Sequence, residues 1–179
     1  MAWFPPINRI STLWSGAEEP SGTTVRKVAP ETIGIVPALL NEITEYWFAN
    51  RQESSIPDWD RFSPHTHTKF LPQIVLWEIQ GDDYFARVTG ETVSDLFPVK
   101  IANRRLNEVI VDLLAFLPTE LDQSVMNSAP IYADRRNAWV LGDEFVHYQA
   151  VHLPFRANDQ QANRVLSVMA FSTEPKIDV

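Results

Sequence analysis

The spacing of apolar residues predicts a helix before the first clear strand. From Pro37 to Arg51, apolar side chains recur every three or four positions, which gathers them on one helical face. Pro37 suits the first turn of such a helix. The stripe expected to be buried comprises Leu39, Leu40, Ile43, Tyr46 and Trp47. Phe48 lies on the opposite, polar side and indicates a second surface that needs cover.

Alternating apolar residues bounded by turn residues predict five β-strands. The first is apolar on both faces, so it requires cover on both sides of the sheet. The expected strands are Gln73–Gln80, Asp83–Thr89, Ile131–Arg136, Glu144–Phe155 and Arg164–Thr173.

The first two strands predict a hairpin with a tight turn at Gly81-Asp82. If the turn has two residues, Leu76 lies opposite Arg87 and Glu78 lies opposite Phe85. Glu78 and Arg87 then share a face at a diagonal distance that permits an ion pair.

Helical segments are predicted between the second and third strands, and a short helix before the first strand. The strongest pattern is a long helix from Asn103 to Leu117 with Leu106, Ile110 and Leu113 on its stripe. Pro118 ends or kinks that helix. The other expected pieces are Ser63 to about Phe70, the residues after Gly90 through Phe97, and Pro118 to about Asn127.

Residues 1–35 differ from the rest because prolines and Gly/Ser pieces interrupt every periodicity. Trp3 and Phe4 are nevertheless too apolar for a simple linker. We interpret these residues as an arm that lies on a single domain formed by residues 36–179. The alternative is an arm that is exchanged between two subunits.

A series of spaced motifs comprises Tyr46-Trp47, Arg51, Ile56-Pro57, Phe62-Ser63-Pro64, the Leu71–Leu76 stretch and Phe85 to Gly90. These motifs resemble those of a divergent bacterial PAS-domain family, whose members are mostly short, stand-alone proteins. The resemblance spans roughly residues 40–173. The chain departs from the family pattern at Glu91, which precedes Thr92, and at Pro98–Ala102, which contains no Gly.

The resemblance implies an α+β fold. Five antiparallel strands in the order 2-1-5-4-3 would be packed by helices on one face and preceded by an N-terminal flanking helix. It also implies a non-enzymatic sensory or regulatory module that binds a small molecule or an unknown signalling protein.

Composition excludes several classes of partner and cofactor. The chain has 179 residues, 45% of them hydrophobic, and a formal net charge of −8, which disfavours nucleic acid and anionic membranes as partners. Met1–Pro6 lacks the features of a signal peptide, so a cytoplasmic location is expected. The sequence has no Cys for a flavin adduct, and residues 101–130 have no His for haem. We therefore expect no cofactor.

The histidines do not predict a metal or catalytic site. His65 and His67 are two positions apart and are expected on a helix surface. His147 and His152 point to opposite faces of one strand, so they cannot converge on one ion. His152 shares a face with Tyr148, which indicates a hydrogen-bonded core or pocket residue.

If a small molecule binds, we expect it between the sheet and the helices of residues 92–117. The candidate ligand-binding residues are Trp77, Arg87, Leu106, Ile110, Leu113, Tyr148, His152 and Met169. In the register above, Trp77 and Arg87 lie on opposite faces and cannot both line one pocket. Arg87 is either an ion-pair partner of Glu78 or an anchor for an anionic ligand.

Apolar area beyond the needs of one core predicts a homodimer through Trp3, Phe4 and Phe48. Two further interpretations stay open. One is a small cone-shaped α+β enzyme of the cyclase or dehydratase kind, which requires a His and a carboxylate in one cavity. The other is a purely structural interaction domain with a filled core.

Overall fold

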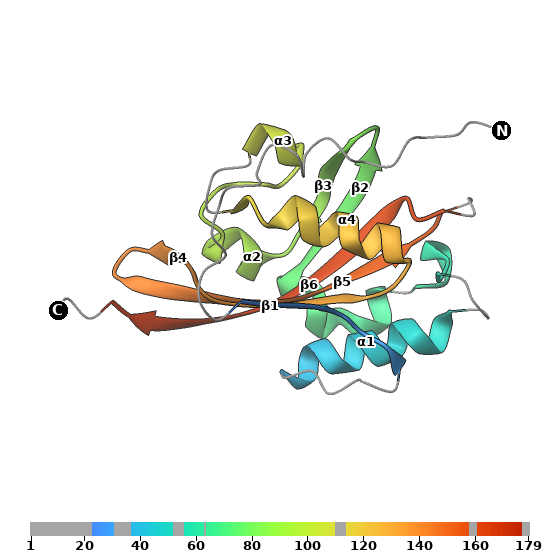
Figure 1. Cartoon of the computed structure of the whole chain (residues 1–179), viewed down its shortest axis with the longest axis horizontal. Helices are drawn as coiled ribbons and strands as arrows, with labels where there is room; N and C mark the ends of the chain where they lie inside the picture. Colours follow the sequence, from blue (N-terminus) through green and yellow to red (C-terminus); the bar gives the residue numbers. More distant parts are fainter. Residues whose placement is uncertain are drawn as a thin grey trace.

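In the computed structural model, residues 23–30, 37–51, 56–62, 64–109, 114–157 and 161–176 are described. They form an antiparallel sheet of six strands with helices on both sides (Figure 1). The strands are β1 Thr23–Lys27, β2 Ile74–Gln80, β3 Asp83–Thr89, β4 Ile131–Leu141, β5 Glu144–Phe155 and β6 Arg164–Pro175. The helices are α1 Ala38–Asn50, α2 Glu91–Leu96, α3 Leu106–Val109 and α4 Leu117–Asn127, with 3-10 helices at Trp59–Arg61 and Pro64–Gln73.

The strand order is β1-β4-β5-β6-β2-β3. Without β1, this order is the predicted 2-1-5-4-3, so the expected α+β architecture is confirmed. β1 is a sixth strand that the sequence pattern did not reveal. It pairs antiparallel with β4, from Thr23 opposite Arg135 to Lys27 opposite Ile131, and so comes from the predicted N-terminal arm.

The two faces of the sheet carry separate cores because neighbouring residues along each strand point in opposite directions. On β5, Tyr148 and Ala150 belong to the cluster beneath α2, α3 and α4, which we call the inner cluster. Val151 and Leu153 belong to the cluster beneath α1 and the 3-10 helices, which we call the outer cluster. Figure 1 shows the sheet between these two layers. The predicted need for cover on both sides is confirmed.

Helix α1 packs on the outer face with a stripe slightly rotated from the predicted one. Thr44 is fully buried, and its hydroxyl donates to the Leu40 carbonyl at 2.7 Å. The Trp47 indole donates to the Pro154 carbonyl at 2.8 Å and ties α1 to β5. Because the stripe includes Thr44, Phe48 is not isolated on a polar face. Its ring is half-buried, 5.1 Å from that of Trp47.

The β2–β3 hairpin follows half of the predicted register. Glu78 lies opposite Phe85 as predicted, but Leu76 pairs with Val88 and not with Arg87. A β-bulge makes Arg87 an extra residue on β3, since Trp77 already pairs with Ala86. The predicted ion pair is present, with Arg87 Nε 3.6 Å from Glu78 Oε1.

The predicted helix from Asn103 to Leu117 is wrong as a continuous element. Residues 103–105 are not helical, α3 is described over Leu106–Val109, and turn residues 115–116 precede α4. Residues 110–113 lie outside the described residues. The helix after Pro118 is confirmed, with this proline in the first turn of α4.

Strands β4 and β6 are longer than predicted. β4 continues to Leu141 across an irregularity in which Asn137 adopts a φ of 50°. β6 continues to Pro175, which pairs with Glu144 at the start of β5. Backbone pairing with β5 supports both extensions, and alternation within one strand does not reveal such pairing.

Gly90 is required where β3 turns into α2. Its φ of −69° suits any residue, but a Cβ there would lie 2.3 Å from the carbonyl oxygens of Leu71 and Pro72. The Gly90 amide also donates to the Ile74 carbonyl at 2.8 Å. The segment that enters β2 is thus packed directly on the Gly90 backbone.

We predict that Gly90→Ala lowers the free energy of unfolding by about 3 kcal/mol or more, because backbone atoms must move. Gly142→Ala is the control. Gly142 has a φ of 60° with nothing within 4 Å of an added Cβ, so that substitution should cost only about 1–2 kcal/mol. Urea unfolding measures both variants, and equal losses would contradict the close packing at Gly90.

Candidate functional site

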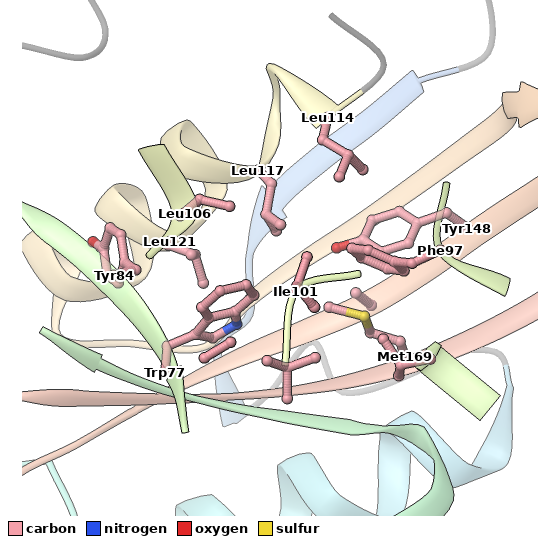
Figure 2. Close-up of a cluster of buried hydrophobic side chains, with 14 of the residues drawn as sticks. Trp77, Tyr84, Phe97, Ile101, Leu106, Leu114, Leu117, Leu121, Tyr148 and Met169 are labelled. Atoms are coloured by element: carbon pink, nitrogen blue, oxygen red, sulfur yellow. The ribbon is translucent and has the colours of Figure 1, made fainter. Parts of the chain in front are cut away.

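The inner cluster brings together four of the residues predicted to bind a ligand. Trp77, Leu106, Tyr148 and Met169 are at most 1% exposed and belong to this one cluster. Figure 2 shows Trp77, Tyr148 and Met169 gathered around Ile101. Sheet and helical segments therefore meet here through large apolar side chains.

Among the other predicted residues that the structure describes, Arg87 does not join this group. Ile110 and Leu113 lie outside the described residues. Arg87 is 58% exposed at its side chain and is paired with Glu78. This exposed ion pair lies away from the inner cluster, so the structure does not bring Arg87 to the predicted pocket.

A buried carboxylate organises the polar part of the inner face. Glu120 lies in the first turn of α4 and is 1% exposed. Its Oε1 accepts a hydrogen bond from Arg135 Nε at 2.7 Å. Its Oε2 lies 3.2 Å from the Tyr148 hydroxyl and 2.9 Å from His152 Nε2. We call these four side chains the Glu120 network.

The network continues across the sheet to β6 and β2. His152 Nδ1 lies 2.7 Å from the Ser167 hydroxyl, which also accepts a hydrogen bond from the Trp77 indole at 2.9 Å. The Trp77 indole, the Ser167 hydroxyl and His152 Nε2 each donate one hydrogen bond if Ser167 donates to Nδ1 and a neutral His152 donates from Nε2 to Glu120. This tautomer is assigned from the hydrogen-bond pattern. The resulting chain of hydrogen bonds runs from Trp77 through Ser167 and His152 to Glu120, and so links β2, β6 and β5 to α4.

Burial strengthens the electrostatics of the network. Arg135 is 4% exposed, and its guanidinium lies 4.2 Å from the centre of the Phe116 ring. It also donates to the Thr23 hydroxyl of β1 at 3.4 Å. Burial, followed by the nearby Glu120 charge, raises the pKa of Tyr148 well above its usual range. Tyr148 therefore remains a neutral hydrogen-bond donor.

The sequence pattern did not reveal a His that meets a carboxylate. His152 meets Glu120, which comes from a helix, so strand parity gave no sign of the pair. The missed signal is on α4, where Glu120 lies three positions after Leu117 and so falls beside it on the buried side of the helix. The pair is enclosed by protein in this structure, with both side chains at most 1% exposed.

A second buried acid lies between α4 and β3. The Tyr84 hydroxyl donates to Asp122 Oδ1 at 2.7 Å. Burial raises the pKa of Asp122, while the hydrogen bond from Tyr84 opposes that rise. Asp83 Oδ1 accepts from the amides of Tyr84 and Asn107, at 2.8 and 3.3 Å. These contacts fix β3 against α3 and α4.

The remaining histidines lie outside the inner face. His147 Nδ1 accepts from the Asn137 amide at 3.1 Å. His67 is half-buried, with its ring centre 4.2 Å from that of Tyr46, so the expected surface position is wrong. The aromatic residues around it provide the apolar surface that buries its ring. The side chain of His65 is outside the described part of the chain.

Among the described residues, no group of three or more His, Cys, Asp or Glu side chains is placed to hold a metal ion. Over the same ranges, every helix is too short or too polar to cross a bilayer. The absence of a cofactor stays a prediction.

Comparison with known proteins identifies the family. The sequence model of the PAS domain matches residues 35–170, so the chain belongs to the PAS domain family. No curated protein and no solved structure matches the chain significantly. The resemblance inferred from the motifs is thereby confirmed, whereas a bacterial origin and a stand-alone organisation stay predictions.

We predict that Glu120→Gln lowers the free energy of unfolding by about 3–5 kcal/mol, because it removes the carboxylate charge that lies 2.7 Å from the buried Arg135 guanidinium. Tyr148→Phe is the control and should cost only about 0.5–1.5 kcal/mol, the value of one hydrogen bond. Adding Arg135→Met to Glu120→Gln should recover most of the loss. Chemical denaturation of the three variants checks this, and a double variant no more stable than Glu120→Gln would contradict a charge-based penalty.

Asp122 predicts a pH dependence of stability. Its folded pKa is raised above 3.8, so its contribution is complete at low pH and is lost as the pH rises through the folded pKa. Asp122→Asn removes this loss. The variant should therefore gain stability relative to the parent between about pH 4 and pH 7 in urea titrations. Tyr84→Phe removes the opposing hydrogen bond and should move the parent's loss to higher pH. A difference between parent and Asp122→Asn that does not change with pH would refute the raised pKa.

Proposed function

We propose, from membership of the PAS domain family, that this chain is a non-enzymatic sensory or regulatory module that binds a small molecule between the inner sheet face and α2–α4. The Glu120 network is the observation that supports this proposal. Hydrogen-bonding side chains from separate elements converge beside an apolar wall, as they do in small-molecule sites. Tyr148 and His152 are the proposed polar anchors.

The segment that covers the inner face, with α2 and α3, provides a route by which a ligand could enter. Helix α2 has six residues, and a helix this short is marginal without tertiary contacts. Ile101 and Leu106 lie in this cover and are buried against the inner cluster. Local opening of short elements requires less free energy than global unfolding. A ligand would therefore enter by displacing this segment, while the sheet stays intact.

A non-enzymatic role is favoured over the cone-type enzyme. A general base must reach its substrate within hydrogen-bonding distance. Both ring nitrogens of His152 are hydrogen-bonded within the protein, so this side chain can anchor a ligand that joins these hydrogen bonds but has no lone pair left with which to take a proton. The pair with Glu120 is thus suited to holding a structure and to sensing its disturbance.

The same network offers a path for output. Glu120 holds Arg135, and Arg135 reaches Thr23 at the beginning of β1. A ligand that competes for Glu120 would weaken the link to this edge strand. The signal would then leave through the N-terminal segment towards a protein partner.

The homodimer expected through Trp3, Phe4 and Phe48 stays a prediction. Trp3 and Phe4 lie outside the described residues. Phe48 contacts Trp47 and the Arg51 guanidinium, so part of its apolar area is used within the chain. The cytoplasmic location is likewise retained as part of the proposal.

A cavity-filling variant tests the ligand site. Ala150 is buried in the inner cluster, whereas Ala170 packs against the outer cluster. We predict that a metabolite screen identifies compounds that raise the melting temperature of the parent and of Ala170→Leu, but not of Ala150→Leu. Two outcomes would contradict the inner site. One is retained binding by Ala150→Leu. The other is a parent without any hit whose Ala150→Leu variant is only destabilised, by about 1–3 kcal/mol, as in a filled core.

A further inference from the structure

A cavity opens on the outer face of the sheet, opposite the proposed inner site. It lies between α1, the 3-10 helices and strands β2, β3 and β6, with a volume of about 120 Å³. Ile43 of α1 contributes to its wall. Because the sheet separates it from the Glu120 network, this cavity is independent of the function proposed above.

The lining is aromatic on one side and aliphatic on the other. Trp59, Phe62 and Phe70 come from the helical segments, while Leu76 and Leu166 come from the sheet. Among the described residues, those that line the cavity include no acidic side chain and no Lys or Arg. An apolar cavity of about 150 Å³ stays free of water and binds benzene, so this space suits one ring.

The rim of the cavity is itself apolar and exposed. Leu71 is 39% exposed and Val88 is 45% exposed, and both contribute to the lining. The β-bulge sets Val88 opposite Leu76, so that the two side chains border the same space. A ligand that fills the cavity would remove part of this apolar surface from water, which is favourable in proportion to the area buried.

One polar group at this site lacks a partner. His67 lines the cavity, and its Nε2 is buried without a hydrogen bond within the described part of the chain. The backbone at His67 leaves the helical region, with φ −125° and ψ 40°. This local break places the imidazole among the rings of Tyr46, Phe62 and Phe70. A buried nitrogen without a partner is costly, and a ligand hydroxyl would satisfy it.

The nearby charges favour an uncharged ligand. Arg164 lies over the Trp59 ring at 5.6 Å, but it is also within 3.9 Å of Glu78. Glu78 is also paired with Arg87. A carboxylate ligand would lose its hydration on entering the cavity. Arg87 and Arg164 would not compensate this loss, because Glu78 already neutralises them.

We propose that this outer cavity binds a small, uncharged, single-ring aromatic molecule that carries one hydroxyl group, with the ring among Trp59, Phe62 and Phe70 and the hydroxyl at His67. The class is that of simple phenols. The ring provides the apolar burial, and the hydroxyl distinguishes the ligand from a plain hydrocarbon.

Calorimetric titration of the full chain with p-cresol, toluene and benzoate tests this ligand class. We expect p-cresol to bind severalfold more tightly than toluene, and benzoate to give no saturable binding. His67→Phe should bring the affinities for p-cresol and toluene to within about twofold, since one hydrogen bond is then lost. Absence of p-cresol binding to the parent, or benzoate binding as tightly as p-cresol, would overturn the proposal.

A matched pair of tryptophan variants tests the location. Val88→Trp fills the rim of the cavity and should weaken p-cresol binding by at least about tenfold. Val140 is similarly exposed, at 43%, and lies on β4 away from the cavity, so Val140→Trp should bind as the parent does. Equal binding by both variants would overturn the site.

If Val88→Trp instead lowers the oligomeric mass in light scattering while p-cresol has no effect on the parent, the cavity is a protein interface and the ligand proposal is refuted. Neither result bears on the inner site, which Ala150→Leu tests separately.

Discussion

The requirement that both faces of the sheet be covered organises this protein. At the centre of the sheet, β5 buries Tyr148 and Ala150 on one side and Val151 and Leu153 on the other. A strand buried on both sides needs a layer of cover above and below it. The helices after β3 supply the inner layer, and α1 with the 3-10 helices supplies the outer layer. The result is one sheet with a separate core on each face.

Within the inner core, the Glu120 carboxylate sets the position of α4 on the sheet. A buried carboxylate is costly unless donors surround it, and three side chains point to Glu120 from β4 and β5. The network therefore fixes the register between the helix and the sheet more narrowly than apolar contacts do. It also links the centre of the domain to the N-terminal edge strand through Arg135 and Thr23. Stability and the proposed relay depend on the same contacts.

Sequence patterns predicted the elements whose signal is local. The bounds of β3 and β5 were predicted without error, because period-two alternation and turn residues mark them. β1 was missed because a short strand such as Thr23–Lys27 is defined by its pairing with β4, not by its own pattern. The bulge at Arg87 was missed because a regular ladder was assumed beyond the turn. Both errors concern backbone pairing between distant residues.

The candidate site was predicted only in part for the same reason. Trp77, Tyr148 and Met169 share the inner face. This could be predicted because the alternation of side chains along a strand is read from the local sequence. The partnership of Glu120 with His152 joins residues 32 positions apart and requires the fold. The outer cavity depends on imperfect packing between α1 and the sheet, which no periodicity encodes.

The central claim is that this PAS domain receives its signal as a bound small molecule. Native mass spectrometry of the freshly purified chain, before and after incubation with a metabolite extract, tests it most directly. The account predicts a discrete mass above that of the protein, which is lost on denaturation and retained when an exposed residue such as Val140 is replaced. A native mass equal to that of the polypeptide under both conditions would contradict the claim and favour a purely structural interaction domain.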